Sequence, residues 1–144
     1  MQSVRIIDLP RMKMVSSGVG MFGDGKLERF AEWFSALPQG LYPEDFLCGN
    51  EQGMFWLFPY RSGMDIGPFE LVDFQGGLYA VATDIDQRTD TKAMRAQVDA
   101  FLEENGLTRD QTRWEMGHIL TSDRAAKILG YYQMDYFIPV KPVG

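Results

Sequence analysis

The sequence has few of the residues that build cysteine- and histidine-based sites. Its 144 residues include one cysteine, Cys48, and one histidine, His118. A lone cysteine cannot form a disulfide within the chain, and one cysteine with one histidine falls short of the four ligands of a structural zinc site. We therefore expect no metal and no cofactor. Cys48 is expected to be a small buried or loop residue, and His118 a hydrogen-bonded structural residue.

Positive charge is also scarce. The 14 lysines and arginines are outnumbered by 20 acidic residues, which gives a formal charge of -6, and the basic residues do not cluster. A protein that binds the phosphate backbone normally displays clustered basic side chains. The composition therefore argues against direct nucleic-acid binding.

Long hydrophobic runs are missing as well. No apolar stretch approaches the roughly 20 residues of a membrane-spanning helix, and the start of the chain lacks a charged leader followed by an apolar segment. We expect a cytoplasmic protein without a membrane partner. With 45% hydrophobic residues in 144, the chain can form the core of one domain, residues 1–144.

The expected elements repeat. Each half has the order strand, helix, strand, strand, and Gly76-Gly77 marks the join. The expected elements are residues 4–16, 26–37, 54–60 and 69–74, then 78–86, 89–106, 113–121 and 134–141. This order predicts an α+β fold, a duplicated βαββ unit with pseudo-repeats 1–75 and 76–144. Two curved antiparallel sheets would carry both helices on one side and a central ligand cleft on the other.

Several local signals refine this arrangement. Pro10 should interrupt the first strand with a bulge or place it at an edge, and Pro139 should place the last strand at an edge or lie near its end, because proline cannot donate to a sheet ladder. Thr89-Asp90-Thr91 should cap the second helix, and Asn105-Gly106 should end it. The long loop 39–53 is typical of a binding loop. The strands 54–60 and 113–121 fall in equivalent places and should meet at the centre.

A glycine-rich stretch follows the first strand. Gly18, Gly20 and Gly23 satisfy G-x-G-x-x-G between a strand and a helix, the context of a dinucleotide fingerprint. In that fingerprint the last glycine lies in the first helical turn and a buried parallel strand follows. Here Asp24-Gly25 intervenes and a polar loop follows the helix. The pattern favours a flexible loop over a nucleotide site.

A single carboxylate stands out in the strand expected at 113–121. Glu115 would lie on one face with Gly117, while Trp114, Met116 and His118 would lie on the other. Burying an unpaired carboxylate is costly, so Glu115 either pairs with an arginine, with Arg113, Arg61 or Arg5 available, or lies at the floor of a cleft and awaits a cation. Aromatic side chains add cation–π attraction in such a cleft. The expected ligand-binding residues are Glu115, Trp33, Trp56, Phe58, Tyr79, Trp114 and Tyr136.

Three stretches carry a family resemblance. They are Leu9-Pro10, Gln75-Gly76-Gly77-Leu78-Tyr79-Ala80-Val81 and Tyr136-Phe137-Ile138-Pro139-Val140-Lys141. They resemble the GyrI-like, or SOUL-like, effector-binding family, the ligand-sensing domain attached to many AraC-type and MerR-type regulators and also found free-standing. Met116-Gly117-His118 with Gly130-Tyr131-Tyr132-Gln133 looks like the subgroup found behind AraC-type DNA-binding domains.

The resemblance covers nearly the whole chain. It implies the duplicated βαββ fold, and it implies binding of hydrophobic, often cationic molecules in the central cleft. The family's pocket acid lies on the strand after the second helix, a place that Glu115 occupies. The family usually has an aromatic residue two positions after that acid, where this chain has Gly117.

Three functions follow from these observations. The first is a stand-alone module, and possible homodimer, that captures amphipathic, cationic drug-like effectors with Glu115 as counter-charge. The second is a hydrolase of electrophilic small molecules that uses Glu115 as general base, with Tyr136 or Tyr79 nearby. The third is an inhibitory protein-interaction module that docks on another protein through its acidic surface.

Overall fold

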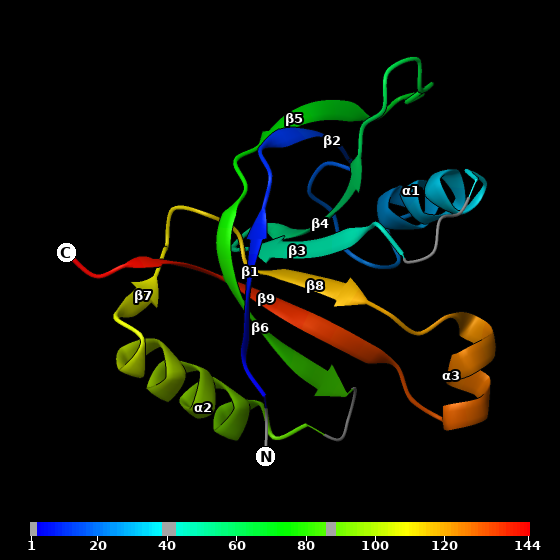
Figure 1. The fold of residues 1–144 in the computed structure, drawn as a ribbon. Helices are drawn as coiled ribbons and strands as arrows, with labels where there is room; N and C mark the ends of the chain where they lie inside the picture. Colours follow the sequence, from blue (N-terminus) through cyan, green and yellow to red (C-terminus); the bar gives the residue numbers. More distant parts are fainter. Residues whose placement is uncertain (1–2, 39–42, 86–88) are drawn as a thin grey trace.

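Twelve helices and strands lie within the described part of the chain. The computed structural model describes residues 3–38, 43–85 and 89–144 (Figure 1). The elements are β1 (Arg5–Leu9), β2 (Met12–Ser16), α1 (Lys26–Ser35), β3 (Phe46–Asn50), β4 (Gly53–Pro59), β5 (Glu70–Phe74), β6 (Gly77–Ile85), α2 (Thr91–Glu104), β7 (Leu107–Arg109), β8 (Met116–Ile119), α3 (Asp123–Leu129) and β9 (Gln133–Pro142). Part of the loop expected at 39–53, namely 39–42, and the last residue of the strand expected at 78–86 lie outside the described residues.

β1 and β2 follow each other as one long strand with an interruption, and β5 and β6 do the same. These two interrupted strands pair with each other. β1 pairs with β6, ending at Leu9 opposite Gly77, and β2 pairs with β5, starting at Met12 opposite Phe74. The interruptions therefore face each other. Gly76 has a φ of 68°, and a Cβ there would lie 2.4 Å from the Leu9 carbonyl oxygen, so the chains approach too closely for a side chain. The breaks expected at Pro10 and Gly76-Gly77 are confirmed.

The sheet is antiparallel and joins two halves at its centre. Its order is β1-β6-β9-β8-β3-β4-β2-β5, and β7 pairs with β9. β3 and β8 meet in the middle with Leu47 opposite Gly117, and β4 and β9 flank them. The units β2-α1-β3-β4 and β6-α2-β8-β9 share the element order of a duplicated βαββ fold, and the second half also contains β7 and α3 (Figure 1).

β3 corrects the predicted alignment of the halves. We expected a loop over 39–53, but Phe46–Asn50 forms a strand. The strand at the sheet centre equivalent to β8 is therefore β3, and β4 corresponds to β9 instead. Gly49 and Asn50 are turn-forming residues, so the sequence predicted a loop. The short apolar segment before them instead pairs with a strand on each side.

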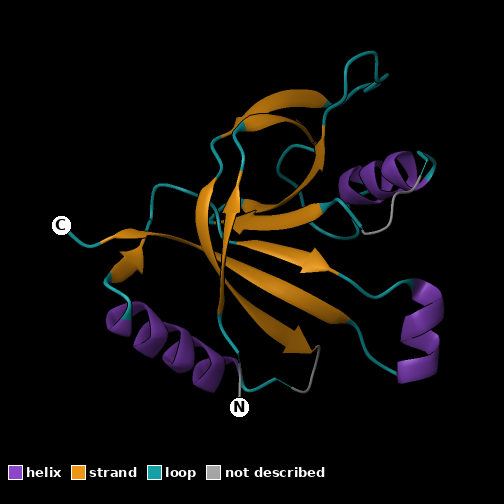
Figure 2. Ribbon diagram, in the orientation of Figure 1, coloured by secondary structure: helices purple, strands orange, loops and turns teal. Residues whose placement is uncertain are grey.

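Helices α1 and α2, drawn in purple in Figure 2, pack on the same face of the sheet, as the cross-strand register shows. Trp56, Leu47, Gly117, Tyr136 and Ala82 are successive cross-strand partners, so their side chains share one face. Ala82 packs in the core beneath α2 with Tyr136 against it, while Trp56 packs against the core beneath α1. The α2 boundaries confirm its predicted cap, since the Asp90 carboxylate accepts a hydrogen bond from the Ala93 amide.

The opposite face is filled by the main hydrophobic core. Phe55, Cys48, Met116, Phe137 and Val81 are successive cross-strand partners there, and all are 5% exposed or less. The sheet curls so that strands from both ends contribute to this core. The side expected to hold an open groove is therefore packed with side chains.

β9 occupies an interior position rather than an edge, and Pro139 lies near the end of the strand, which is the other placement that the sequence predicted. It lies between β6 and β8, and β7 pairs with its last residues. The β8 pairing ends at Phe137 and the β7 pairing begins at Val140, so Pro139 falls in a gap between the two neighbours. Its carbonyl accepts the Asp110 amide across that gap, where no ladder hydrogen bond from Pro139 is required.

No helix within the described ranges is long and apolar enough to cross a membrane.

Candidate functional site

Glu115 lies immediately before β8 rather than inside a strand. The sequence predicted a strand from 113 to 121, but β8 begins at Met116 and ends at Ile119. Glu115 still shares the helix-covered face with Gly117 and Tyr136. Its side chain is 38% exposed, so the carboxylate is reachable by solvent.

Three donors contact the Glu115 carboxylate. Arg95 Nη1 and Arg109 Nη1 lie 3.4 and 3.3 Å from Oε1, and the Tyr136 hydroxyl donates to Oε2 at 3.0 Å. The arginines that pair with Glu115 are therefore Arg95 of α2 and Arg109 of β7, not the three that the sequence offered. An ion pair thus exists at the site.

Each arginine has a second and shorter contact. Arg95 Nη2 donates to the Tyr136 hydroxyl at 2.9 Å, and its guanidinium lies 5.3 Å from the centre of the Tyr136 ring. Arg109 donates to Asp99 Oδ1 at 2.9 Å from Nη2 and at 3.1 Å from Nε. Neither guanidinium would lose its principal partner if Glu115 turned toward a ligand.

The Tyr136 hydroxyl keeps its proton. Burial raises its pKa above the usual value of 10.0, and the adjacent Glu115 charge and hydrogen bond raise it further. Tyr136 is therefore a stable hydrogen-bond donor to the carboxylate at neutral pH.

A groove of about 440 Å³ opens beside this cluster, and we call it the Glu115 groove. Its lining includes Arg95, Arg109, Gln111, Trp114, Glu115 and Ile138. Its volume lies within the range of small-molecule pockets. Charged and apolar groups thus meet at one opening.

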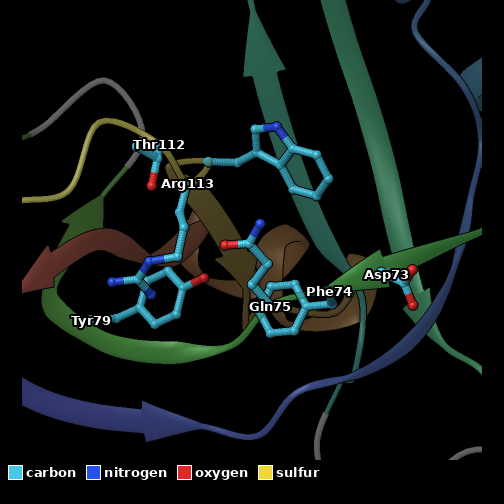
Figure 3. A pocket seen from close by; sticks show the side chains of 7 residues that line it. Asp73, Phe74, Gln75, Tyr79, Thr112 and Arg113 are labelled. Carbon is cyan, nitrogen blue, oxygen red and sulfur yellow. The ribbon is translucent and has the colours of Figure 1, made fainter.

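A smaller hollow of about 110 Å³ adjoins the groove, and we call it the Tyr79 hollow (Figure 3). It is lined by Asp73, Phe74, Gln75, Tyr79, Thr112, Arg113 and Trp114. Arg113 and Trp114 line both openings, so the two are neighbours. Trp114 is 38% exposed and its ring packs edge-on against Phe55 at 4.9 Å.

Arg113 fixes the segment that carries Trp114 and Glu115. Its side chain is 9% exposed, and its guanidinium donates to the carbonyls of Gly76, Leu78 and Val140. Nε also donates to Asp110 Oδ2 at 3.0 Å. The guanidinium lies 4.9 Å from the Tyr79 ring centre (Figure 3). Arg113 thus joins the loop before β8 to β6 and β9 rather than neutralising Glu115.

Asp110 completes this anchor. The Thr112 hydroxyl and amide, followed by Arg113, hold the pKa of its carboxyl well below the usual value. Asp110 therefore remains charged beside Arg113 over the whole neutral range.

The seven residues expected to bind ligand fall into two groups. Glu115, Trp114 and Tyr79 line the groove or the hollow near the loop that precedes β8, and Tyr136 hydrogen-bonds Glu115 there. The remaining three, Trp33, Trp56 and Phe58, pack in the aromatic core beneath α1. The structure therefore separates these three rings from Glu115.

Two residues at the site were missed by the sequence reasoning. Arg95 and Arg109 reach Glu115 from α2 and β7, 20 and 6 positions away. A charged residue beside the apolar stripe of α2 was the one available signal for Arg95. No local pattern pointed to Arg109.

His118 and Cys48 have the structural roles that the sequence predicted. His118 Nε2 hydrogen-bonds the Pro43 carbonyl, and its ring packs against Phe46 at 5.0 Å. Cys48 is buried in the main core, which raises its thiol pKa to about 12. Within residues 3–38, 43–85 and 89–144, no group of three or more histidine, cysteine or acidic side chains could hold a metal ion.

The glycine-rich loop has no free amide cradle for a phosphate. Glu28 accepts the amides of Gly23 and Gly25, and Asp24 accepts those of Met21 and Lys26. Two carboxylates therefore occupy the donors that a nucleotide phosphate would need.

Comparison with protein-family models and with curated proteins gives no match. Solved structures do match. A hydrolase from Listeria innocua has a TM-score of 0.70 at 14% identity, with 96% of this chain and 92% of that chain covered. SAV2435 bound to tetraphenylphosphonium has a TM-score of 0.54 at 14% identity, with 96% and 94% covered.

The EcmrR C-terminal domain is a third similar structure. It has a TM-score of 0.61 at 11% identity, with 99% of this chain and 98% of that chain covered. Against the longer EcmrR chain in its DNA complex, the match spans 58% of that chain. The protein thus has the same α+β fold as these three, with its curled antiparallel sheet and flanking helices.

Proposed function

We propose that this protein is a small-molecule-binding module of the GyrI-like effector-binding type, and that it captures hydrophobic organic cations in the Glu115 groove. The observation that carries the proposal is the state of Glu115. Its carboxylate is partly exposed in a groove, and its contacts with both arginines are longer than those arginines' contacts with Tyr136 and Asp99.

A cation can therefore compete with the two arginines for the Glu115 carboxylate. Arg95 keeps Tyr136 and Arg109 keeps Asp99 when Glu115 turns to a ligand. Trp114 supplies an exposed ring beside the carboxylate, and cation–π attraction adds roughly 0.5–2 kcal/mol. A neighbour with the same fold, SAV2435, was solved with tetraphenylphosphonium, an apolar cation of this kind.

The test uses two ligands of the same shape and opposite charge. Tetraphenylphosphonium should raise the unfolding temperature and bind in calorimetry, whereas tetraphenylborate should do so at least tenfold more weakly. Glu115→Gln should weaken tetraphenylphosphonium at least tenfold, equivalent to about 1.4 kcal/mol. The matched control, Glu104→Gln at the exposed end of α2, should bind like the parent. Equal binding of both ligands, or parental affinity in Glu115→Gln, would contradict the proposal.

Hydrolysis is a second candidate, because a proton acceptor and a proton donor adjoin in the groove. The Tyr136 hydroxyl lies 3.0 Å from Glu115 Oε2, and the Listeria innocua neighbour is described as a hydrolase. Glu115 would act as general base for attack of water on an electrophilic ligand. Mass spectrometry of a reaction with an electrophilic epoxide panel should then show hydrated product that Glu115→Gln does not form. Stoichiometric binding without product would exclude this function for the compounds tried.

A further inference from the structure

The acid–aromatic pair of the Glu115 groove has a counterpart in the first half. Asp45 immediately precedes β3 as Glu115 precedes β8, and β3 and β8 pair at the sheet centre. Trp56 Nε1 donates to Asp45 Oδ2 at 2.8 Å, and the Tyr136 hydroxyl donates to Glu115 Oε2 at 3.0 Å. In both halves the acid before the inner strand binds an aromatic donor on the next strand.

The two acids differ in how their charge is balanced. Glu115 is partly exposed and contacts two arginines. Asp45 is 9% exposed, and among residues 3–38, 43–85 and 89–144 no cation forms an ion pair with it. A buried carboxylate that lacks a cation is costly in free energy, and one neutral indole donor compensates only part of that cost.

Aromatic rings surround the Asp45–Trp56 pair. The Trp56 ring meets Phe34 of α1 at 5.3 Å and Phe22 at 6.0 Å, both edge to face. Phe22 lies in the glycine-rich loop and is 55% exposed, as is its neighbour Met21 at 57%. Phe22 therefore contacts the Trp56 ring from an exposed position in the loop.

We propose that Asp45, Trp56 and Phe22 form a second binding site for an organic cation with apolar substituents, of the quaternary ammonium or phosphonium class. The carboxylate supplies the counter-charge, and the two rings supply apolar and cation–π contacts. Met21 and Phe22 are exposed beside this pair, where a ligand can first make contact. This site is separate from the Glu115 groove and does not depend on it.

The test counts sites with tetrabutylammonium, which absorbs no near-ultraviolet light. Calorimetry at constant ionic strength should give two sites per chain in the parent, one in Asp45→Asn, one in Glu115→Gln and none in the double variant. In a Trp114→Phe background, tryptophan emission should change on titration, and Asp45→Asn should reduce that change at least tenfold at a fixed concentration. Asparagine keeps an oxygen for Trp56, so the variant preserves the local hydrogen bond.

A second variant keeps the test decisive if Asp45→Asn unfolds. Phe22→Ala alters an exposed ring without touching the carboxylate, and it should weaken the Glu115-independent site at least threefold. One site in the parent that Glu115→Gln abolishes would overturn this proposal and leave the Glu115 groove standing. Binding lost in Asp45→Asn and kept in Glu115→Gln would support the second site and overturn the Glu115 groove. No binding at all to the parent would overturn both.

Discussion

Replacing Arg113 with methionine should destabilise the whole protein, although the residue lies in a loop. Methionine matches much of the apolar length of arginine but cannot donate hydrogen bonds. The change removes four bonds, to Asp110 and to the carbonyls of Gly76, Leu78 and Val140. Because the guanidinium is 9% exposed, water cannot readily take its place at all four acceptors.

The expected loss follows from the acceptors left behind. Each buried acceptor without a donor costs roughly 1–3 kcal/mol, and removing one partner of a buried charged pair costs about 3–5 kcal/mol in measured cases. Asp110 keeps its Thr112 donors, which limits its share. We therefore expect the free energy of unfolding to fall by about 4 kcal/mol in Arg113→Met, measured by urea denaturation followed by tryptophan fluorescence and circular dichroism.

A matched variant separates this effect from loss of any arginine. Arg95 is 42% exposed and contacts Glu115 at 3.4 Å, so Arg95→Met should cost less than about 1 kcal/mol. If Arg113→Met also costs less than about 1 kcal/mol, the guanidinium does not join the loop to the sheet and the reasoning fails.

Two further changes test the packing of the fold. Gly76→Ala should lower the free energy of unfolding by about 3 kcal/mol, because its φ of 68° disfavours a side chain and the new Cβ would meet the Leu9 carbonyl at 2.4 Å. Gly117→Ala should lower it by about 1 kcal/mol, because its Cβ would meet the flexible Met134 side chain at 2.5 Å. Equal losses in urea denaturation would show that backbone approach does not matter at Gly76. Burial raises the Cys48 pKa from 9.0 to about 12, so its contribution to stability is fully present below pH 9 and is lost as the pH rises toward 12, by about 1.4 kcal/mol per pH unit relative to Cys48→Ala. Parallel stability profiles of the two proteins between pH 8 and 11 would contradict this.

Local signals were strong enough to predict most elements. The α2 cap at Asp90, the breaks at Pro10 and Gly76, and the α+β class all follow from residues whose preferred backbone geometry is restricted. β3 was missed because Gly49 and Asn50 favour turns, and only pairing with β4 and β8 makes the segment a strand. The start of β8 at Met116 was misplaced for the same reason, since strand boundaries depend on the partner strand.

The candidate site, like the fold, could be predicted from the sequence only in part. The sequence identified Glu115 as the residue that needs explanation, because a carboxylate within an apolar segment must find a partner. It did not identify Arg95 and Arg109 as that partner, nor Asp45 as the equivalent acid in the other half. Those contacts join residues of different helices and strands, so the spacing of residues along the sequence does not predict them.

The sequence alone predicted most of the helices and strands, the points where the chain must bend, and which acid is unusual. The tertiary structure alone decided which arginines meet that acid, which aromatic rings lie beneath α1, and which face of the sheet is filled by core. The physical reason is range: backbone preferences act between neighbours in the chain, whereas charge pairing and burial act between surfaces that meet only after the sheet has curled.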